Sequence, residues 1–196
     1  MCIIDTFCQA IGERDSYTIE HSKKVACLMA SFAQYVKLPG EDVTMAYLLG
    51  IVHDIGKVKV PDHILNKPGR LSEDEFAVIK QHPDIGAGLI SQVEGMEKVA
   101  DIVRHHHERF DGHGYGQGLL GKKIPFFSRM LSVCDSFDAM TSSRCYRPTP
   151  LSVSKALEEV VKCAGTQFDP EICKSFVEFI QSHMEQGELT LAVSDA

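Results

Sequence analysis

Several features are missing from this sequence of 196 residues, and each absence excludes a class of protein. No apolar run approaches the ~18 to 20 residues that a membrane-spanning helix requires. Residues 1–10 carry an acid and no Lys or Arg, unlike a secretory signal. The net charge of −7 provides no basic excess for a nucleic-acid polymer, although local cations beside a metal still suit a small phosphate ligand. We therefore expect no membrane partner and no nucleic-acid polymer.

The cysteines also lack a recognisable pairing pattern. Their number is seven, which is odd, and none of them forms a C-x-x-C pair. Cys27, Cys134, Cys163 and Cys173 lie among apolar residues, where a free thiol behaves as a small hydrophobic group. This usage favours a reducing, cytoplasmic setting.

Alternating strand patterns are nearly absent, and apolar residues recur at helical spacing. The chain is long enough for one well-buried domain. Helices are predicted over 16–36, 41–55, a stretch opened by the capping box Ser72-x-x-Glu75, 84–93, 96–107, 126–141, 151–163 and 169–183. Loops are predicted over 57–71 and 111–121, with Gly56 as a helix stop. We expect a single all-α domain over 1–182 and a C-terminal tail over 183–196.

His53 and Asp54 end a predicted helix whose preceding residues, 46–52, are apolar. Neighbouring positions on a helix differ by ~100°, so both side chains can reach one point beside it. A buried Asp needs a partner or a cation, and Lys57 shares the face of Asp54 if the helix continues. A lone His at a helix end is usually structural, but the adjacent Asp favours metal binding.

Further candidate ligands are scattered along the chain. They are His21, His82, His105, His106, His107 and Asp135. Three consecutive histidines on a helix cannot all face one site, so one of the three is expected to be a bystander. Asp135 lies in an apolar run, where an unpaired carboxylate would be costly. Each residue has a credible structural explanation, but so many together in one small domain favour a metal centre.

The ligand types indicate the chemistry. A set of His and Asp without Cys is unlike a structural zinc site and favours Mn or Fe. Two such ions suit hydrolysis at phosphorus, because they generate a hydroxide nucleophile and clamp the attacking and leaving oxygens. Lys57 and Arg144 are candidates for holding phosphate oxygens, Arg144 with bidentate geometry. The alternative for Arg144 is a surface salt bridge.

Seven motifs, spread over about Arg14 to Phe179, together resemble the HD-GYP family. They are Arg14-Asp15-x-Tyr17-Thr18-x-x-His21-Ser22, His53-Asp54-Ile55-Gly56-Lys57, Pro61-Asp62-x-Ile64-Leu65-x-Lys67-Pro68-Gly69, His106-His107-Glu108-Arg109-Phe110-Asp111-Gly112-x-Gly114-Tyr115, Asp135-x-x-Asp138-Ala139-Met140-Thr141, Arg144-x-Tyr146-Arg147 and Gly165-Thr166-Gln167-Phe168-Asp169-Pro170. No single motif is specific, since HD pairs occur in many phosphohydrolases, but the ordered set is.

The resemblance implies a bacterial second-messenger enzyme that hydrolyses cyclic di-GMP to pGpG, GMP or both. It also implies a helical HD-type domain with its metal site between helix ends and loops. The implied metal ligands are His21, His53, Asp54, His82, His106, His107 and Asp135. Asp54 would bridge two ions, and His105 becomes the bystander. Lys57 and Arg144 would contact substrate phosphate, and Gly114 and Tyr115 would line the nucleotide. Some members hold a third metal through a carboxylate at the position of Tyr17. Because tyrosine has no carboxylate, two ions, Fe or Mn, are expected here.

One position departs from the family pattern: Gly116 stands where the family has Pro. Ordering a Gly loop costs roughly 0.4 to 1 kcal/mol more than ordering one with Pro, provided that the geometry suits Pro. No metal ligand is lost. The same loop is expected to meet a diguanylate cyclase or a sensory domain, so partner choice is affected more than chemistry.

Two other functions are compatible with these motifs. One is a non-catalytic cyclic-dinucleotide receptor or signalling scaffold, against which the intact ligand set speaks. The other is hydrolysis of a different cyclic dinucleotide, because contacts to the bases cannot be inferred from these motifs.

Overall fold

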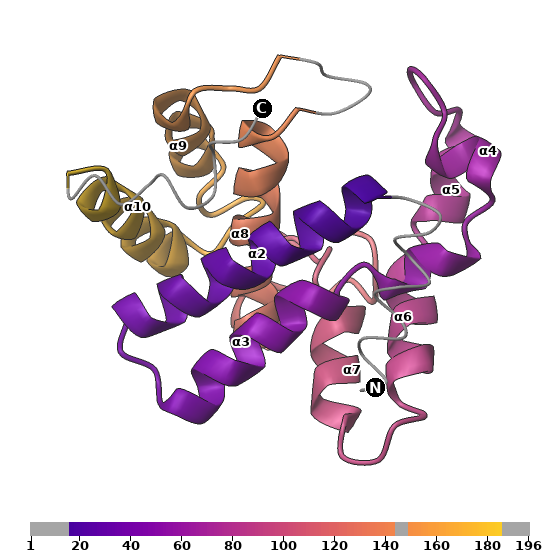
Figure 1. Ribbon diagram of the computed structural model, residues 1–196, viewed down its shortest axis with the longest axis horizontal. Coiled ribbons are helices and arrows are strands. Elements are labelled where there is room, and N and C mark those ends of the chain that lie inside the picture. The colour runs from indigo at the N-terminus through magenta and orange to yellow at the C-terminus, as the bar shows by residue number, and fades with distance from the viewer. Residues whose placement is uncertain (1–15, 144–148, 186–196) are drawn as a thin grey trace.

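The computed structural model describes residues 16–143 and 149–185, which form helices and no strand. The α-helices are labelled in Figure 1. In chain order the elements are α2 (Ser16–Tyr35), α3 (Gly40–Val52), η1 (Ile55–Lys59), α4 (Asp62–Leu65), α5 (Glu73–Ile79), α6 (His82–Ile90), α7 (Glu97–Arg104), η2 (Gly121–Lys123), α8 (Phe126–Thr141), α9 (Val153–Lys162) and α10 (Pro170–Glu185). The expected all-α class is confirmed. In the described part of the chain, no helix is both long and apolar enough to cross a membrane.

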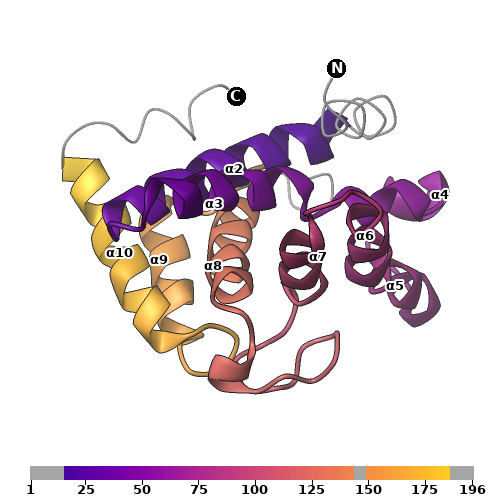
Figure 2. The same cartoon turned by 90° about the horizontal axis from the view of Figure 1, so that it is seen from below.

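The helices form two layers. Figure 2 shows α2 and α3 side by side along one edge of the molecule, with α6, α7, α8, α9 and α10 standing beneath them. The hydrophobic core fills the space between the layers. Phe176 of α10 lies there against Phe32 of α2 and Phe137 of α8, with ring centroids 5.2 Å apart in both pairs. This packing holds α8, the helix of Asp135, against the helix of His21.

The two helices of the upper layer touch backbone to backbone at Gly50. A Cβ added there would lie 2.3 Å from the Cα of Ala26 and 2.5 Å from its nitrogen. Because backbone atoms cannot rotate away, only glycine allows this approach. His21 lies on α2 and His53 directly follows α3, so the Gly50 contact sets how close those two side chains come.

We expect Gly50→Ala to lower the free energy of unfolding by about 2 kcal/mol, because overpacking outweighs the gain in helix propensity. Urea unfolding measures the change. The matched control is Gly88→Ala in α6, where an added Cβ meets nothing within 4 Å. That variant should be as stable as the parent or more so. Equal effects of the two substitutions would contradict the role assigned to Gly50.

The local structure corrects four expectations. The segment 57–71 is not all loop, since it contains the end of η1 and the short helix α4. Gly56 is not a helix stop: α3 ends earlier, and a Cβ at Gly56 would lie 1.9 Å from the carbonyl oxygen of His82. Helix α7 ends at Arg104, so the three histidines lie in the turn that follows it. Cys27 is exposed, whereas Cys134 and Cys173 are buried as expected.

The expected capping box is confirmed at the start of α5. The Ser72 hydroxyl accepts from the Glu75 amide, and the Glu75 carboxylate accepts from the Ser72 amide. Lys67 adds an ion pair to the same carboxylate at 2.7 Å. These contacts fix the start of α5, and Phe76 of the same helix lies beside Tyr115, with ring centroids 6.2 Å apart. At the other end of the chain, α10 continues to Glu185.

Candidate metal centre

The predicted ligands come from distant parts of the chain and meet between the two layers. They are His21 in the second turn of α2, His53 and Asp54 after α3, His82 at the start of α6, His106 and His107 after α7, and Asp135 in the middle of α8. Two groups have ligand atoms that all lie within 4.8 Å of one another: Asp54, His82, His106 and His107 form one, and His21, His53 and Asp54 form the other. Asp54 belongs to both groups.

Three of the histidines are oriented by the same local device. The Nδ1 of each donates to the carbonyl oxygen three residues earlier, from His53 to Gly50 at 2.8 Å, from His82 to Ile79 at 2.8 Å and from His106 to Val103 at 2.6 Å. A carbonyl only accepts, so Nδ1 carries the proton and Nε2 is left with its lone pair. These Nε2 atoms point into the site, as metal-binding imidazoles do.

His21 is held by carboxylates instead. The Nδ1 of His21 lies 2.6 Å from Asp138 Oδ2, and its Nε2 lies 2.9 Å from Asp135 Oδ1. Asp138 is a residue whose role the sequence did not reveal, although the motif contained it. Its spacing of three residues from Asp135 on one helix was the available signal, because such residues share a face.

The arrangement fits a cation. The Nε2 atoms of His82 and His106 lie 3.3 Å apart, and both carry lone pairs, which repel without a positive charge between them. The Nε2 of His53 is buried and makes no hydrogen bond within the described chain, and Asp54 Oδ2 is 3.4 Å away. Buried polar atoms normally have partners. The donor set, imidazole nitrogen plus carboxylate oxygen, matches Mn, Fe or Zn.

The protonation states agree with this fit. Burial lowers the pKa of His106 well below its usual value, and His107 and His82 lower it further. Burial and His82 lower the pKa of His107 to about 3. Burial raises the pKa of Asp54, but Lys57 and His53 outweigh it and hold the value well below the usual range. Neutral imidazoles and ionised carboxylates are the forms that bind a divalent cation.

His21 is the exception among the histidines. Burial lowers its pKa, but hydrogen bonds with Asp135 and Asp138 outweigh this and raise the pKa to about 9. For Asp135, burial raises the pKa, and the hydrogen bond and charge of His21 outweigh it, so the carboxyl stays ionised. In the metal-free protein at neutral pH, a proton on His21 therefore occupies this half of the site.

Three of the four residues expected to contact substrate lie around the same centre. Lys57 donates to Asp54 Oδ2 at 2.6 Å through the turn of η1, so the expected shared face is confirmed. The Tyr115 ring stacks on the His107 ring, with centroids 4.5 Å apart and planes 29° apart. A Cβ at Gly114 would lie 2.5 Å from the carbonyl oxygen of His107, which explains the glycine. Arg144 and the side chain of Tyr17 lie outside the described residues.

His105 is not part of either ligand group. Its side chain is buried and lies near two acids, with Nδ1 3.6 Å from Glu108 Oε1 and Nε2 3.7 Å from Asp101 Oδ1. The turn after α7 thus directs His105 away from the centre toward which His106 and His107 point.

Comparison with known proteins agrees with this geometry. The family model of the HD domain matches residues 5–172. A cyclic di-GMP phosphodiesterase of Pseudomonas aeruginosa is 41% identical over 85% of this chain, and the match covers 40% of that protein. A 3'3'-cGAMP-specific phosphodiesterase of Vibrio cholerae is 38% identical over 75% of this chain and 34% of that protein. The chain thus spans well under half the length of these curated relatives.

A solved structure shares the fold. The HD domain of the phosphodiesterase PgpH from L. monocytogenes, in complex with cyclic di-AMP, matches with a TM-score of 0.68 at 19% identity. The match covers 92% of this chain and 96% of that chain. The His/Asp centre, the helical fold and the family match lead to one assignment. The chain belongs to the HD domain family, in its HD-GYP branch.

Proposed function

We propose that this domain is a metal-dependent phosphodiesterase that hydrolyses cyclic di-GMP to pGpG, GMP or both. The observation that carries the proposal is the pair of ligand groups that share Asp54. His82, His106 and His107 would hold one divalent ion and His21, His53 and Asp135 a second, and Asp54, which belongs to both groups, would serve both. The His/Asp donor set favours Fe or Mn for both positions.

Bound divalent ions would lower the pKa of water and stabilise charge on phosphate oxygens. The chain's own residues orient the other components. Lys57, held by Asp54, presents its ammonium group beside the centre, where it can bind a phosphate oxygen. We assign Arg144 to a second phosphate oxygen. Tyr115, beside His107, presents an aromatic ring at the edge of the centre on which a base can stack.

Support for a cyclic dinucleotide as substrate comes from the relatives, whose names specify cyclic di-GMP or 3'3'-cGAMP. Cyclic di-GMP is proposed because the relative named for it is the more similar of the two. A sensory domain or a diguanylate cyclase that contacts the loop around Tyr115 is the proposed partner.

The test is metal analysis after anaerobic purification, followed by hydrolysis of cyclic di-GMP, 3'3'-cGAMP and cyclic di-AMP by the Mn- and Fe-loaded protein. We expect about two ions per chain and fastest turnover of cyclic di-GMP. Faster turnover of another dinucleotide would move the substrate assignment while leaving the phosphodiesterase in place. Binding of the dinucleotides without turnover, in the presence of metal, would replace the enzyme with a receptor.

Metal uptake should release a proton from His21. The pKa of about 9 exceeds the usual 6.5, so the protonated ring stabilises the metal-free protein below pH ~6.5, and this contribution is lost as the pH rises through ~9. Metal and proton compete for Nε2, so we expect release of about one proton near pH 7.5 and tighter metal binding toward pH ~9.

Calorimetry in buffers of different ionisation enthalpy counts the released proton. His63→Ala, at an exposed position on α4, is the control and should leave the count unchanged. A proton count of zero for the parent protein would contradict the competition at His21.

A further inference from the structure

The glycine that departs from the family pattern has a backbone conformation that proline cannot adopt. Gly116 has φ +150°, whereas proline is confined to about −65°. The loop geometry therefore does not suit Pro at position 116. The extra entropy cost of ordering Gly instead of Pro, which assumed a geometry that suits Pro, does not apply here. A Cβ at Gly116 would also lie 2.6 Å from Glu108 Oε1. The loop therefore packs directly on the Glu108 carboxylate.

Glu108 is a buried acidic residue. Its side chain is fully buried at the turn after α7. Oε1 accepts from the backbone amide of Gln117 at 2.5 Å, and Oε2 is buried without a hydrogen bond within the described chain. The Nδ1 of His105 lies 3.6 Å from Oε1. Burying a carboxylate costs free energy. The hydrogen bond between Glu108 and the backbone of the loop is a contact that can explain why the carboxylate is buried.

The loop is held at two points on either side of Tyr115. On one side, Gly114 lies so close to the backbone of His107 and Arg109 that a Cβ would be 2.5 Å and 2.4 Å from their atoms. On the other side, the Gln117 amide is bound by Glu108. Between these points the Tyr115 ring stacks on His107, and it also makes an edge-type contact with the Phe76 ring, with ring centroids 6.2 Å apart.

We propose that Glu108 is a positioning residue: its buried carboxylate anchors the turn 114–117 and so holds Tyr115 against His107, at the place where the nucleotide binds. Gly116 is required because any side chain there would displace this carboxylate. His105, which takes no part in the ligand groups, supports Glu108 from the other side. The inference rests on the proposed function for its kinetic readout but not for its structural one.

The first experiment compares Glu108→Ala with Glu108→Gln in the full chain. Glu108→Ala should raise KM for cyclic di-GMP about tenfold, a usual loss for a misplaced stacking ring, while kcat and metal content stay within about twofold of the parent. Hydrogen exchange at the backbone amide of Gln117 should accelerate about tenfold or more, because this N–H loses its acceptor. Glu108→Gln keeps an acceptor oxygen and should restore both values.

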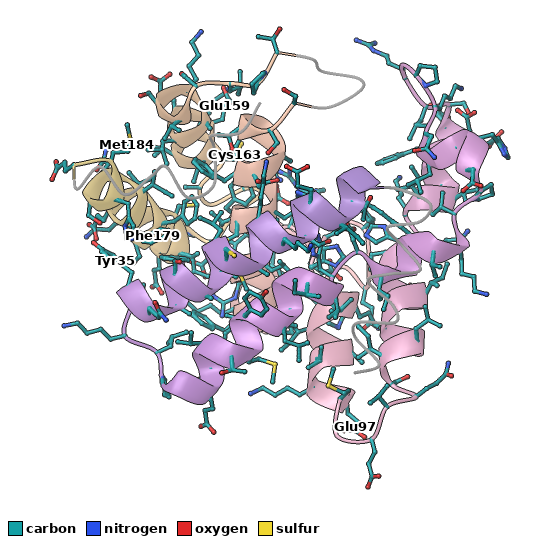
Figure 3. The ribbon with its side chains drawn as sticks, viewed as in Figure 1. Tyr35, Glu97, Glu159, Cys163, Phe179 and Met184 are labelled. Carbon is teal, nitrogen blue, oxygen red and sulfur yellow. The ribbon has the colours of Figure 1, made fainter. Side chains whose placement is uncertain are left out.

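The control is Glu97→Ala, at the opposite end of α7, where the side chain points into solvent (Figure 3). It should change neither KM nor exchange. Gly116→Ala provides the second variant: its Cβ displaces the carboxylate, so it should raise KM as Glu108→Ala does. Because both act on one contact, the double variant should be no worse than either single variant.

Several results would overturn the proposal. Loss of bound metal in Glu108→Ala, or a fall in kcat at unchanged KM, would mean that Glu108 supports the turn that carries His106 and His107 and not the turn 114–117. Unchanged exchange at Gln117 would also refute it, even if the parent protein does not hydrolyse cyclic di-GMP. Absence of hydrolysis by the parent, with faster exchange in Glu108→Ala, would refute the proposed substrate and keep the anchor.

Discussion

Replacing Asp54 by alanine should remove both metal ions and lower phosphodiesterase turnover by on the order of a thousandfold or more. The reason is the position of the carboxylate between the two ligand groups. Its Oδ1 lies 3.2 Å from His82 Nε2, and its Oδ2 lies 3.4 Å from His53 Nε2. No other residue belongs to both groups among those that the structure describes. Loss of one side chain therefore weakens both metal positions together.

Metal content and turnover of the purified variant measure this effect. Asp54→Asn is the second variant, because it keeps the volume of the buried side chain and separates loss of ligand from loss of packing. Asp74→Ala, at an exposed position on α5, is the control and should keep both ions and full activity. If Asp54→Ala retained one ion with unchanged affinity, Asp54 would be a ligand of one ion and not the bridge.

Replacing Asp138 should weaken the ion assigned to His21 and spare the other. Asp138 accepts from His21 Nδ1 at 2.6 Å and is itself buried, so it fixes both the proton and the orientation of the ring. Loss of such an outer partner commonly costs about 10- to 100-fold in metal affinity or activity. We expect Asp138→Ala to fall near the upper end, and Asp138→Asn, which keeps an acceptor oxygen, near the lower end.

Titration of each variant with metal, read by calorimetry, should show one ion bound as tightly as in the parent and one bound more weakly. The control is Ser142→Ala. Its hydroxyl lies 3.2 Å from the other oxygen of Asp138, so its removal should change affinity much less. Two ions bound with parental affinity in Asp138→Ala would show that Asp138 does not orient the His21 ring.

Part of the candidate centre followed from residue types. Asp54 and Asp135 were predicted as ligands because a carboxylate in apolar helical surroundings needs a cation or a partner, and the family resemblance implied the complete ligand set. The pairing of Asp54 with Lys57 followed from a spacing of three residues, which survives the change from α3 to the η1 turn. The family resemblance implied that His105 is not a ligand. The turn after α7 gives the physical reason, because it directs the His105 side chain away from the centre.

The glycines were less predictable, because a sequence does not reveal which backbones will meet. Gly56 looked like a helix stop, but it lies against the carbonyl oxygen of His82 and brings η1 against α6. Gly116 was predicted only to make the loop more flexible than Pro would. Its positive φ and its contact with Glu108 depend instead on a turn that lies eight residues away in the chain. Glycine is required in both cases by the approach of another segment.

The sequence by itself thus determined the helical class, because periodicity carries that information, and its motifs supplied the candidate metal ligands and the proposed chemistry at phosphorus. The tertiary structure decided how the ligands divide around Asp54, that Asp138 orients His21, and that Glu108 lies beneath Gly116. These relations join residues up to 117 positions apart, as between His21 and Asp138. They depend on how closely helices pack, and local spacing does not encode that distance.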